Sequence, residues 1–306
     1  PRGTLHLLPA RELGLWNRAL AAVPSAGGRH GDGVDLSPQQ RDAVVEAVGD
    51  ALADERLTLA QLDAAVAKRA GRWAGERVLP AFGERVARWR QAIAVAANRG
   101  VLCFGPDEGR ARTYVHPRGW LDGVARVGER RALDELLRRY LGAYGPATPA
   151  QFARWLGTRT EWAAERFDAL AGELEEIAVG GGSGWLLRDD AALPDDRPRS
   201  VRLLPYFDPF VVGCHPRERL FPPAAAARAL RNGQAGNFPV LLIDGIVAGV
   251  WSQRRRGRRL DLTVEPLRRL PAVRRGPLEH EVGRVAAILE ASAELRLDRV
   301  KIGGHG

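Results

Sequence analysis

The chain has 306 residues, of which 45% are hydrophobic and 27% charged, a balance that supports a folded core and excludes an intrinsically disordered protein. Its formal net charge of +9 points to a polyanionic partner. Cys103 and Cys214 lie far apart and show neither a disulfide framework nor the spacing of zinc ligands. No apolar run reaches the length of a membrane span. We therefore expect a cytoplasmic monomer that needs no metal and no other cofactor.

A pattern of helices followed by a hairpin begins at Ser37. Ser37 before Pro38 is typical of a helix start, and valines then recur on one stripe of "QQRDAVVEAVGDALA". A second helix is predicted to begin at Thr58, and a third in "FGERVARWRQAIAVAANRG", with Gly100 as its stop. The strands "VLCFG" and "RTYVHP" then form a hairpin. This order predicts a winged-helix domain over residues 37–120.

The pattern returns 90 residues later. "LTLAQLDAAVAKR" at 57–69 matches "ATPAQFARWLGTR" at 147–159. The second copy follows the predicted helix "RALDELLRRYLGAYG" and precedes the helix "TEWAAERFDALAGEL" and the strands "EEIAVG" and "GWLLRD". We therefore predict a second winged helix over residues 130–190. The run "GGGSG" between its strands lacks the ending of a phosphate-binding loop, which favours a wing tip.

The two ends of the chain differ from this repeat. Residues 1–36 open on "PRGTLHLLPA", which is typical of the middle of a strand, and predict the remnant of a further winged-helix region whose upstream part precedes Pro1. Residues 200–306 predict β-hairpins, one of them turning at Asp244-Gly245, and a closing helix over 278–293. The predicted fold class is thus α+β: tandem winged-helix domains followed by a small C-terminal β-hairpin domain with a terminal helix.

Arginine is concentrated at one predicted hairpin turn. Between Trp251 and Arg275 nine arginines accompany two acidic residues, a net charge of +7, whereas the rest of the chain carries only +2. Such crowding is relieved by phosphates, and guanidinium groups suit phosphate oxygens and narrow minor grooves. A solvated turn is the alternative interpretation. Five of these arginines fall within six consecutive positions: Arg254, Arg255, Arg256, Arg258 and Arg259.

Four segments carry a resemblance to a known family. They are "RGTLHLLPA", "RRYLGAYGPATPAQFARWLG", "VRLLPYFDPFVVG" and "LLIDGIVAGVW", in this order along the chain. They resemble the winged-helix DNA-binding family that contains the bacterial AlkZ-like and YcaQ-like DNA glycosylases, enzymes that unhook interstrand crosslinks. The resemblance implies a basic cleft for double-stranded DNA, damaged or intact, and a β-hairpin near the C-terminal end that probes the duplex.

The resemblance also implies a chemistry, which is hydrolysis of the bond between an alkylated or crosslinked purine and its deoxyribose. In that family a polar pair such as Gln-x-Gln, upstream of the "RGTLH" strand, positions the water. In this chain the pair would precede Pro1, and Gln39-Gln40 does not match it. The alternatives are a non-catalytic winged-helix DNA-binding protein or transcriptional regulator, and a protein-interaction scaffold.

Further candidates come from single positions. Arg85, Arg88 and Arg99 are predicted on one side of the third helix, where they would either enter the major groove or remain solvated. Asp208 either forms an Asx turn at a strand end or places a carboxylate at the cleft to stabilise a developing oxocarbenium ion. Strand alternation puts His6 on one face with Arg2. There the two side chains would line a lesion pocket, or His6 would be an ordinary core or surface histidine.

Overall fold

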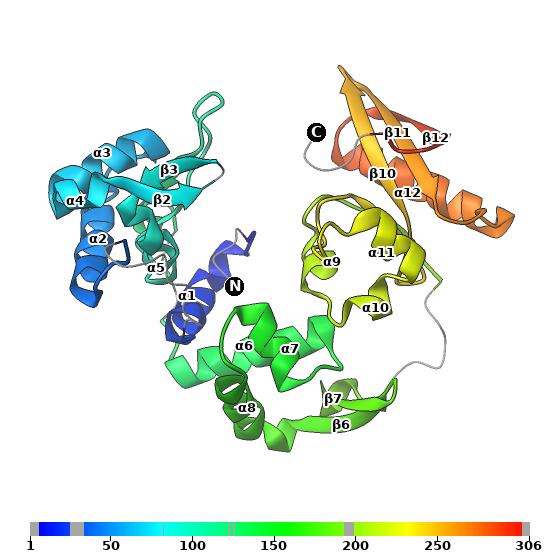
Figure 1. Cartoon of the computed structure of the whole chain (residues 1–306), viewed down its shortest axis with the longest axis horizontal. Helices are drawn as coiled ribbons and strands as arrows, with labels where there is room; N and C mark the ends of the chain where they lie inside the picture. Colours follow the sequence, from blue (N-terminus) through cyan, green and yellow to red (C-terminus); the bar gives the residue numbers. More distant parts are fainter. Residues whose placement is uncertain are drawn as a thin grey trace. The chain divides into compact units, whose positions relative to one another are not determined.

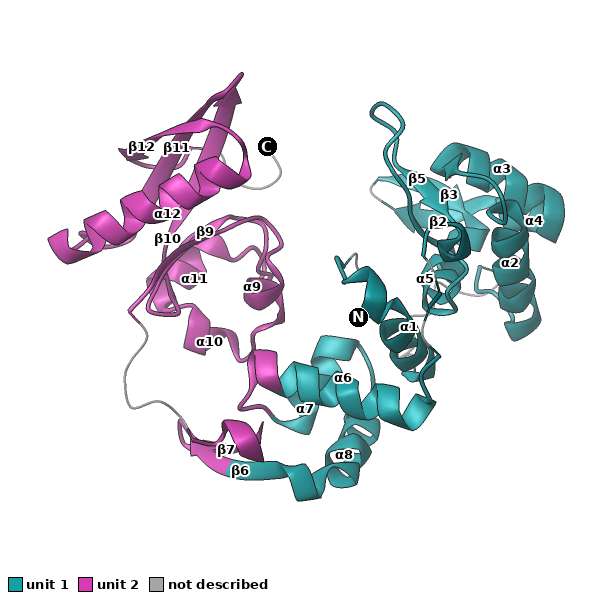
Figure 2. Ribbon diagram, turned by 180° about the vertical axis from the view of Figure 1, so that it is seen from behind, with its two compact units in different colours: residues 1–141, 148–176 teal, residues 142–147, 177–306 magenta. Residues whose placement is uncertain are grey.

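The computed structural model describes residues 6–24, 34–81, 83–121, 123–124, 126–192 and 199–301. Helices and strands are mixed along the whole chain (Figure 1). The chain divides into two compact units, residues 1–141 with 148–176 and residues 142–147 with 177–306 (Figure 2). No helix within the described ranges is both long and apolar enough to cross a membrane.

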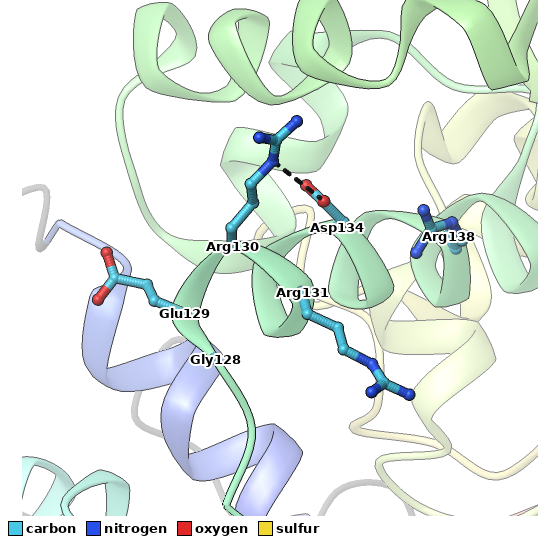
Figure 3. Close-up of a pocket in the computed structure, with 6 residues that line it drawn as sticks. All are labelled: Gly128, Glu129, Arg130, Arg131, Asp134 and Arg138. Atoms are coloured by element: carbon cyan, nitrogen blue, oxygen red, sulfur yellow. Dashed lines mark ion pairs between the residues drawn. The ribbon is translucent and has the colours of Figure 1, made fainter.

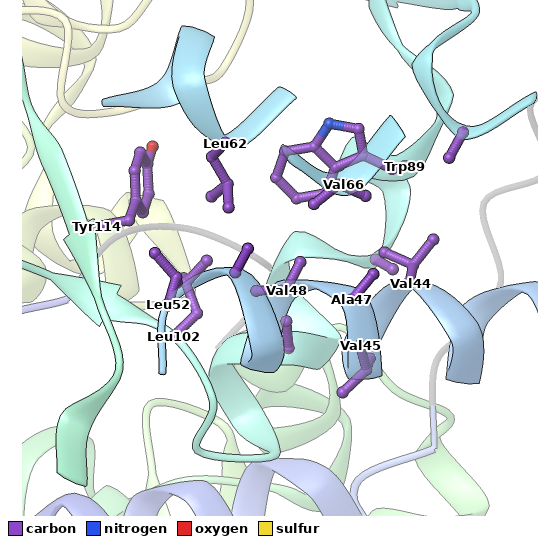
Figure 4. Packing of buried hydrophobic residues seen from close by; sticks show 14 of the residues in the cluster. Val44, Val45, Ala47, Val48, Leu52, Leu62, Val66, Trp89, Leu102 and Tyr114 are labelled. Atoms are coloured by element: carbon purple, nitrogen blue, oxygen red, sulfur yellow. The ribbon is translucent and has the colours of Figure 1, made fainter. Parts of the chain in front are cut away.

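The first repeat has helices before its hairpin, as predicted. Its core gathers around Trp89, Leu62 and Val48, which are fully buried (Figure 4). The short strands form a sheet in the order β1-β5-β4. With the preceding helix α1 (Leu13–Ala22), the elements are α2 (Pro38–Ala51), β1 (Leu57–Thr58), α3 (Leu59–Ala70), α4 (Arg72–Gly75), β2 (Arg77–Ala81), β3 (Glu84–Ala87), the 3-10 helix η2 (Arg88–Ala92), α5 (Ile93–Asn98), β4 (Cys103–Phe104) and β5 (Thr113–Val115).

Helices α2 and α3 start where local signals predicted. The Ser37 hydroxyl accepts a hydrogen bond from the Gln40 backbone N–H at 3.1 Å, and the Gln40 side chain accepts one from Ser37 N–H at 2.9 Å. Thr58 and Gln61 form the same reciprocal pair at the start of α3. Each pair satisfies two N–H groups that a helix start leaves unbonded.

The prediction of a third helix was wrong for its first residues. Glu84–Ala87 is strand β3, which pairs antiparallel with β2. Gly83 has φ +83° at the turn between them, a conformation that glycine adopts without steric cost. Strand pairing therefore replaces the helix that the apolar spacing indicated, and only η2 and α5 remain helical. Gly100, at φ +75°, follows the end of α5 as predicted.

The second repeat reproduces the local construction of the first. Thr148 and Gln151 form a capping box like that of Thr58 and Gln61. The residue before each cap bridges to the hairpin of its own repeat: Leu57 pairs with Tyr114, and Ala147 exchanges two backbone hydrogen bonds with Trp185, at 3.0 and 2.8 Å. The elements are α6 (Glu129–Tyr144), α7 (Pro149–Leu156), α8 (Thr160–Ala169), β6 (Leu174–Val179) and β7 (Gly182–Leu187).

The C-terminal region is built on a sheet in the order β12-β11-β10-β9-β8. Helix α12 covers one face, where Leu278 and Val282 pack with Leu260 and Leu262. Helices α9 to α11 supply residues to a second cluster on the other face. The elements are β8 (Val201–Leu204), α9 (Pro209–Gly213), α10 (Arg217–Leu220), α11 (Pro223–Ala229), β9 (Val240–Ile243), β10 (Ile246–Arg256), β11 (Arg259–Pro266), α12 (Arg275–Ile288) and β12 (Ser292–Leu297).

The end of the predicted closing helix was also wrong. Helix α12 ends at Ile288, and residues 292–297 form strand β12, parallel to β11. Glu290 has φ +49°, which a helix interior does not allow. The predicted Asp244-Gly245 turn is confirmed: both residues have positive φ, and Ile243 pairs with Ile246 across the turn.

Candidate nucleic-acid interface

The arginine cluster lies at the tip of the β10–β11 hairpin. Strand β9 pairs with β10 only as far as Val250, whereas β11 pairs with β10 as far as Arg256. The residues of β10 between Val250 and the turn of the hairpin therefore extend past the end of β9. Gly257 provides the left-handed conformation of the turn, with φ +60°, and all five arginines from Arg254 to Arg259 are exposed.

The acidic residues near the tip neutralise only part of this charge. Asp261 lies 3.6 Å from Arg256 and 3.2 Å from Arg259, and Glu294 pairs with Arg259 as well. Among the described side chains, neither Arg254 nor Arg258 has an ion-pair partner, and the Arg255 guanidinium donates to the Gly257 carbonyl at 2.9 Å. Phosphate oxygens would supply the counter-charge that the protein itself does not.

Strand alternation distributes the hairpin side chains over two faces. Val250 packs into the cluster formed with α9 to α11, and Trp251 into the cluster with α12. Because alternate residues of a strand share a face, Arg254 and Arg256 lie on the Val250 face. Arg255 lies on the Trp251 face.

The structure does not bring Arg85, Arg88 and Arg99 onto one helix face, so that prediction was wrong. Arg85 is on strand β3. Arg88 is nearly buried, with 14% of its side chain exposed, and donates to Glu76 at 2.7 Å and to the Val34 carbonyl at 3.2 Å.

Arg99 follows the last residue of α5 and pairs with Asp42 at 2.7 Å. Helix α5 itself contacts both α1 and α2, and all its residues are at least partly buried. This helix is therefore poorly placed to enter a DNA groove.

Asp208 caps a helix. Its Oδ1 accepts hydrogen bonds from the backbone N–H groups of Phe210 at 3.0 Å and Val211 at 3.4 Å, at the start of α9. Of the two interpretations of this residue, the Asx turn is the one that the local geometry shows.

Two further predicted residues lie at the start of the chain. Arg2 falls outside the described residues. His6 is exposed, and residues 6–9 have no regular secondary structure, so the described part of the predicted strand is irregular.

A metal centre finds no support among the described residues, where no three His, Cys, Asp or Glu side chains are grouped to hold an ion. Burial raises the pKa of the Cys214 thiol, so this side chain is a neutral thiol near pH 7.

An open depression lies at the start of α6 (Figure 3). Arg130 and Arg131 point to different sides of it, and Arg130 lies 4.0 Å from Asp134. Arg138 makes a bidentate pair with Glu173, both bonds at 2.8 Å, which raises the pKa of the guanidinium. The charges at this depression are largely paired within the protein, unlike those of the hairpin.

An exposed hairpin with this much unneutralised positive charge is a surface suited to nucleic acid. The family model for AlkZ-like DNA glycosylases matches residues 1–288. The chain belongs to the AlkZ-like DNA glycosylase family, which confirms the resemblance seen in the sequence.

A similar sequence and a similar solved structure support this membership. The interstrand DNA cross-link repair glycosylase of Streptomyces sahachiroi is 30% identical over 267 residues, which cover 82% of this chain and 68% of that protein. The solved structure of the DNA glycosylase AlkZ from Streptomyces sahachiroi is similar with a TM-score of 0.72 and 27% identity, covering 96% of this chain and 80% of that one. The chain is thus a DNA-repair glycosylase homologue of mixed α and β structure.

Proposed function

We propose that this protein is a DNA glycosylase that hydrolyses the bond between an alkylated or crosslinked purine and its deoxyribose. The observation that carries the proposal is the arginine-tipped hairpin, whose strand β10 extends past its neighbour β9, in a chain of this family. The similar Streptomyces protein is named for interstrand crosslink repair. A crosslinked nucleotide is tethered to the opposite strand and cannot rotate fully out of the duplex. An open, projecting hairpin suits such a lesion better than a closed pocket.

We further propose that residues 37–120 and 130–190 are tandem winged helices, after a related N-terminal region within 1–36 and before a hairpin domain over 200–306. The supporting features are the capped second helix of each repeat and the strand bridge that ties the residue before it to the following hairpin. The first repeat carries an additional hairpin, β2–β3, between its second and third helices. Since α5 is packed against α1, we assign DNA contact to the hairpins rather than to this helix.

For the hairpin, we assign phosphate contacts first to the arginines with no acidic partner in the described structure, Arg254 and Arg258, together with Arg255. Arg256 and Arg259 would exchange Asp261 for phosphate when DNA binds. Arg2, Arg85, Arg88 and Arg99 are weaker candidates for DNA contact, since Arg88 and Arg99 already hold internal partners.

Two side chains remain candidates for the hydrolytic step. His6 is exposed, and Asp208 has one oxygen, Oδ1, engaged in its cap. Conversion of Asp208 to Asn keeps a capping oxygen but removes the charge. If Asp208 stabilises a cationic transition state, Asp208→Asn will lower the rate of base release and leave DNA affinity unchanged.

The test of the main proposal is base release from duplex DNA that carries a ring-alkylated guanine or an interstrand crosslink. The full natural chain is compared with a variant in which Arg254, Arg255 and Arg258 are Ala. The matched control removes three exposed arginines that already have acidic partners, Arg18, Arg77 and Arg275. We expect release by the wild type and by the control, and a large loss in the hairpin variant.

Other outcomes assign the protein to another class. Tight, salt-sensitive binding without release would replace the enzyme with a non-catalytic DNA-binding protein, because phosphate contacts weaken steeply as salt rises. Absence of salt-sensitive binding would favour a protein-interaction scaffold.

A further inference from the structure

The loop between β8 and α9 exposes aromatic side chains on a strained backbone. Phe207 has φ +53°, and 53% of its surface is exposed, while Phe210 is 38% exposed. A bulky residue in the left-handed region is a genuine outlier. Such outliers persist only where the surrounding structure holds them, and they concentrate at functional sites.

Several contacts hold this loop in place. The Phe207 N–H donates to the Gly236 carbonyl at 3.1 Å, and Asp208 caps the helix that follows. The Tyr144 hydroxyl donates to the Pro209 carbonyl at 2.8 Å. Gly236 has φ +100°, and a Cβ at that position would lie 2.8 Å from a ring carbon of Phe207. The Phe207 ring therefore lies against a position that only glycine fits, while about half of the residue's surface remains exposed.

The loop begins next to strand β10, a few residues before the arginines of the hairpin. The Leu204 carbonyl, at the end of β8, accepts a hydrogen bond from Trp251 Nε1 at 2.8 Å. The chain thus leaves the sheet where β10 continues beyond its neighbour β9 towards Arg256. Helix α9 packs through Val211 on the Val250 face of the sheet.

Arg254 and Arg256 project from that same face, and Arg255 from the opposite one. Arg256 is engaged by Asp261. Arg254 is thus the hairpin arginine that shares a face with α9 and has no ion pair within the described structure.

We infer that Phe207, supported by Phe210, stacks on a nucleobase of the bound DNA while Arg254 contacts the backbone phosphate of the same strand. A nucleotide joins a planar aromatic base to an anion, and an exposed ring on the same side of the sheet as an unneutralised guanidinium complements both parts. Base–aromatic stacking tolerates any sequence, because every base has a π-face. The inference rests on the proposed function and adds to it a residue that contacts the substrate.

The test uses the full natural chain and a duplex with 2-aminopurine next to an alkylated guanine. Phe207→Asn removes the ring but tolerates the left-handed backbone, and Phe207→Trp keeps an aromatic ring. Loss of one stacked base weakens binding about 5- to 150-fold. We expect Phe207→Asn to weaken binding within that range and to increase 2-aminopurine fluorescence in the saturated complex. Phe207→Trp should retain both wild-type properties.

Coupling to the hairpin provides the matched control. If Phe207 and Arg254 hold one nucleotide, Phe207→Asn combined with Arg254→Ala will lose less affinity than the product of the two single losses. The same substitution combined with Arg255→Ala, on the opposite face, should lose the full product.

Different results would overturn the stacking role of Phe207 alone or the proposed glycosylase function as a whole. Base release by the wild type, with affinity and fluorescence unchanged in Phe207→Asn, overturns the inference alone. A lower melting temperature in Phe207→Asn with unchanged fluorescence also overturns it, because the ring would then serve only the fold. If the wild type neither binds nor releases bases from DNA, the proposed function fails and the inference fails with it.

Discussion

Arginines in the β10–β11 hairpin and around the third helix of the first repeat were both predicted to contact DNA, but they differ in whether they have acidic partners. Arg88 and Arg99, around that helix, each pair with a carboxylate of the same unit. Arg254 and Arg258, on the hairpin, lie exposed with no acidic partner among the described residues. A surface for DNA is therefore indicated by the cations that the fold leaves without partners, rather than by the number of arginines.

The largest effect is expected from the hairpin. Replacement of Arg254, Arg255 and Arg258 by Ala should weaken binding to duplex DNA on the order of 100-fold or more at about 0.1 M salt, because each lost phosphate contact lowers the salt slope by about 0.9. The midpoint of thermal unfolding should remain unchanged. The measurement is the dissociation constant between 50 and 200 mM salt. A parallel shift of the salt plot without a change in slope would contradict the phosphate assignment.

Replacement of the buried, ion-paired Glu281 is expected to lower stability and leave DNA affinity unchanged. Glu281 is 1% exposed and accepts hydrogen bonds from Arg284, at 2.7 and 2.8 Å, and from the Leu203 backbone N–H at 3.0 Å. Glu281→Gln should lower the free energy of unfolding by about 2 kcal/mol, since hydrogen bonds to charged groups contribute about 1.5–3 kcal/mol each. DNA affinity should stay at the wild-type value. The measurements are a urea titration and a binding assay at one salt concentration.

The same carboxylate predicts how stability depends on pH. Burial raises the pKa of Glu281, but the hydrogen bonds from Arg284 and Leu203 outweigh it, and the pKa lies below its ordinary value. The pKa of Glu265 is also lowered, chiefly by its hydrogen bonds with Arg228. Because the folded state prefers the ionised form of both, their stabilisation is complete above the ordinary carboxyl pKa of about 4.3 and is lost as the pH falls through the folded-state values. Glu281→Gln should flatten that acid slope, and an unchanged slope would contradict the assignment.

A smaller loss of stability is expected at Arg88. Arg88→Ala removes the bonds to Glu76 and to the Val34 carbonyl, and should cost about 1 kcal/mol of unfolding free energy. DNA binding should change less than twofold. If Arg88→Ala weakened DNA binding as strongly as Arg254→Ala, the distinction between paired and unpaired arginines would fail.

Local signals in the sequence predicted much of the fold. Ser37 and Thr58 correctly predicted the starts of α2 and α3, because the partner of each cap lies only three residues away. Both errors in predicted helices, at residues 84–87 and 292–297, fall on strands whose pairing depends on another segment of the chain. Helical spacing of apolar residues does not distinguish such strands from a helix end.

In the candidate site, too, features set by the local sequence were predicted and features set by distant residues were not. Charge density and strand alternation predicted the arginine hairpin. The partners of Arg88 and Arg99 lie 12 and 57 residues away, too far to be read from the local sequence. The conformation of Phe207 depends on Gly236 across the loop, and no local pattern indicates it.

The smallest effect is expected at Asp261, where loss of an acidic partner should raise the affinity for DNA. Asp261 pairs with both Arg256 and Arg259, and Arg259 also pairs with Glu294. Asp261→Asn therefore frees Arg256, leaves Arg259 with Glu294 alone and removes one negative charge near the tip. We expect duplex affinity to rise about two- to fivefold, in line with the 0.2–1 kcal/mol of an exposed ion pair. The matched control is Asp54→Asn, an exposed acidic residue of the first repeat, which changes the net charge equally. An equal gain in both variants would show that net charge, and not the release of particular arginines, determines the affinity.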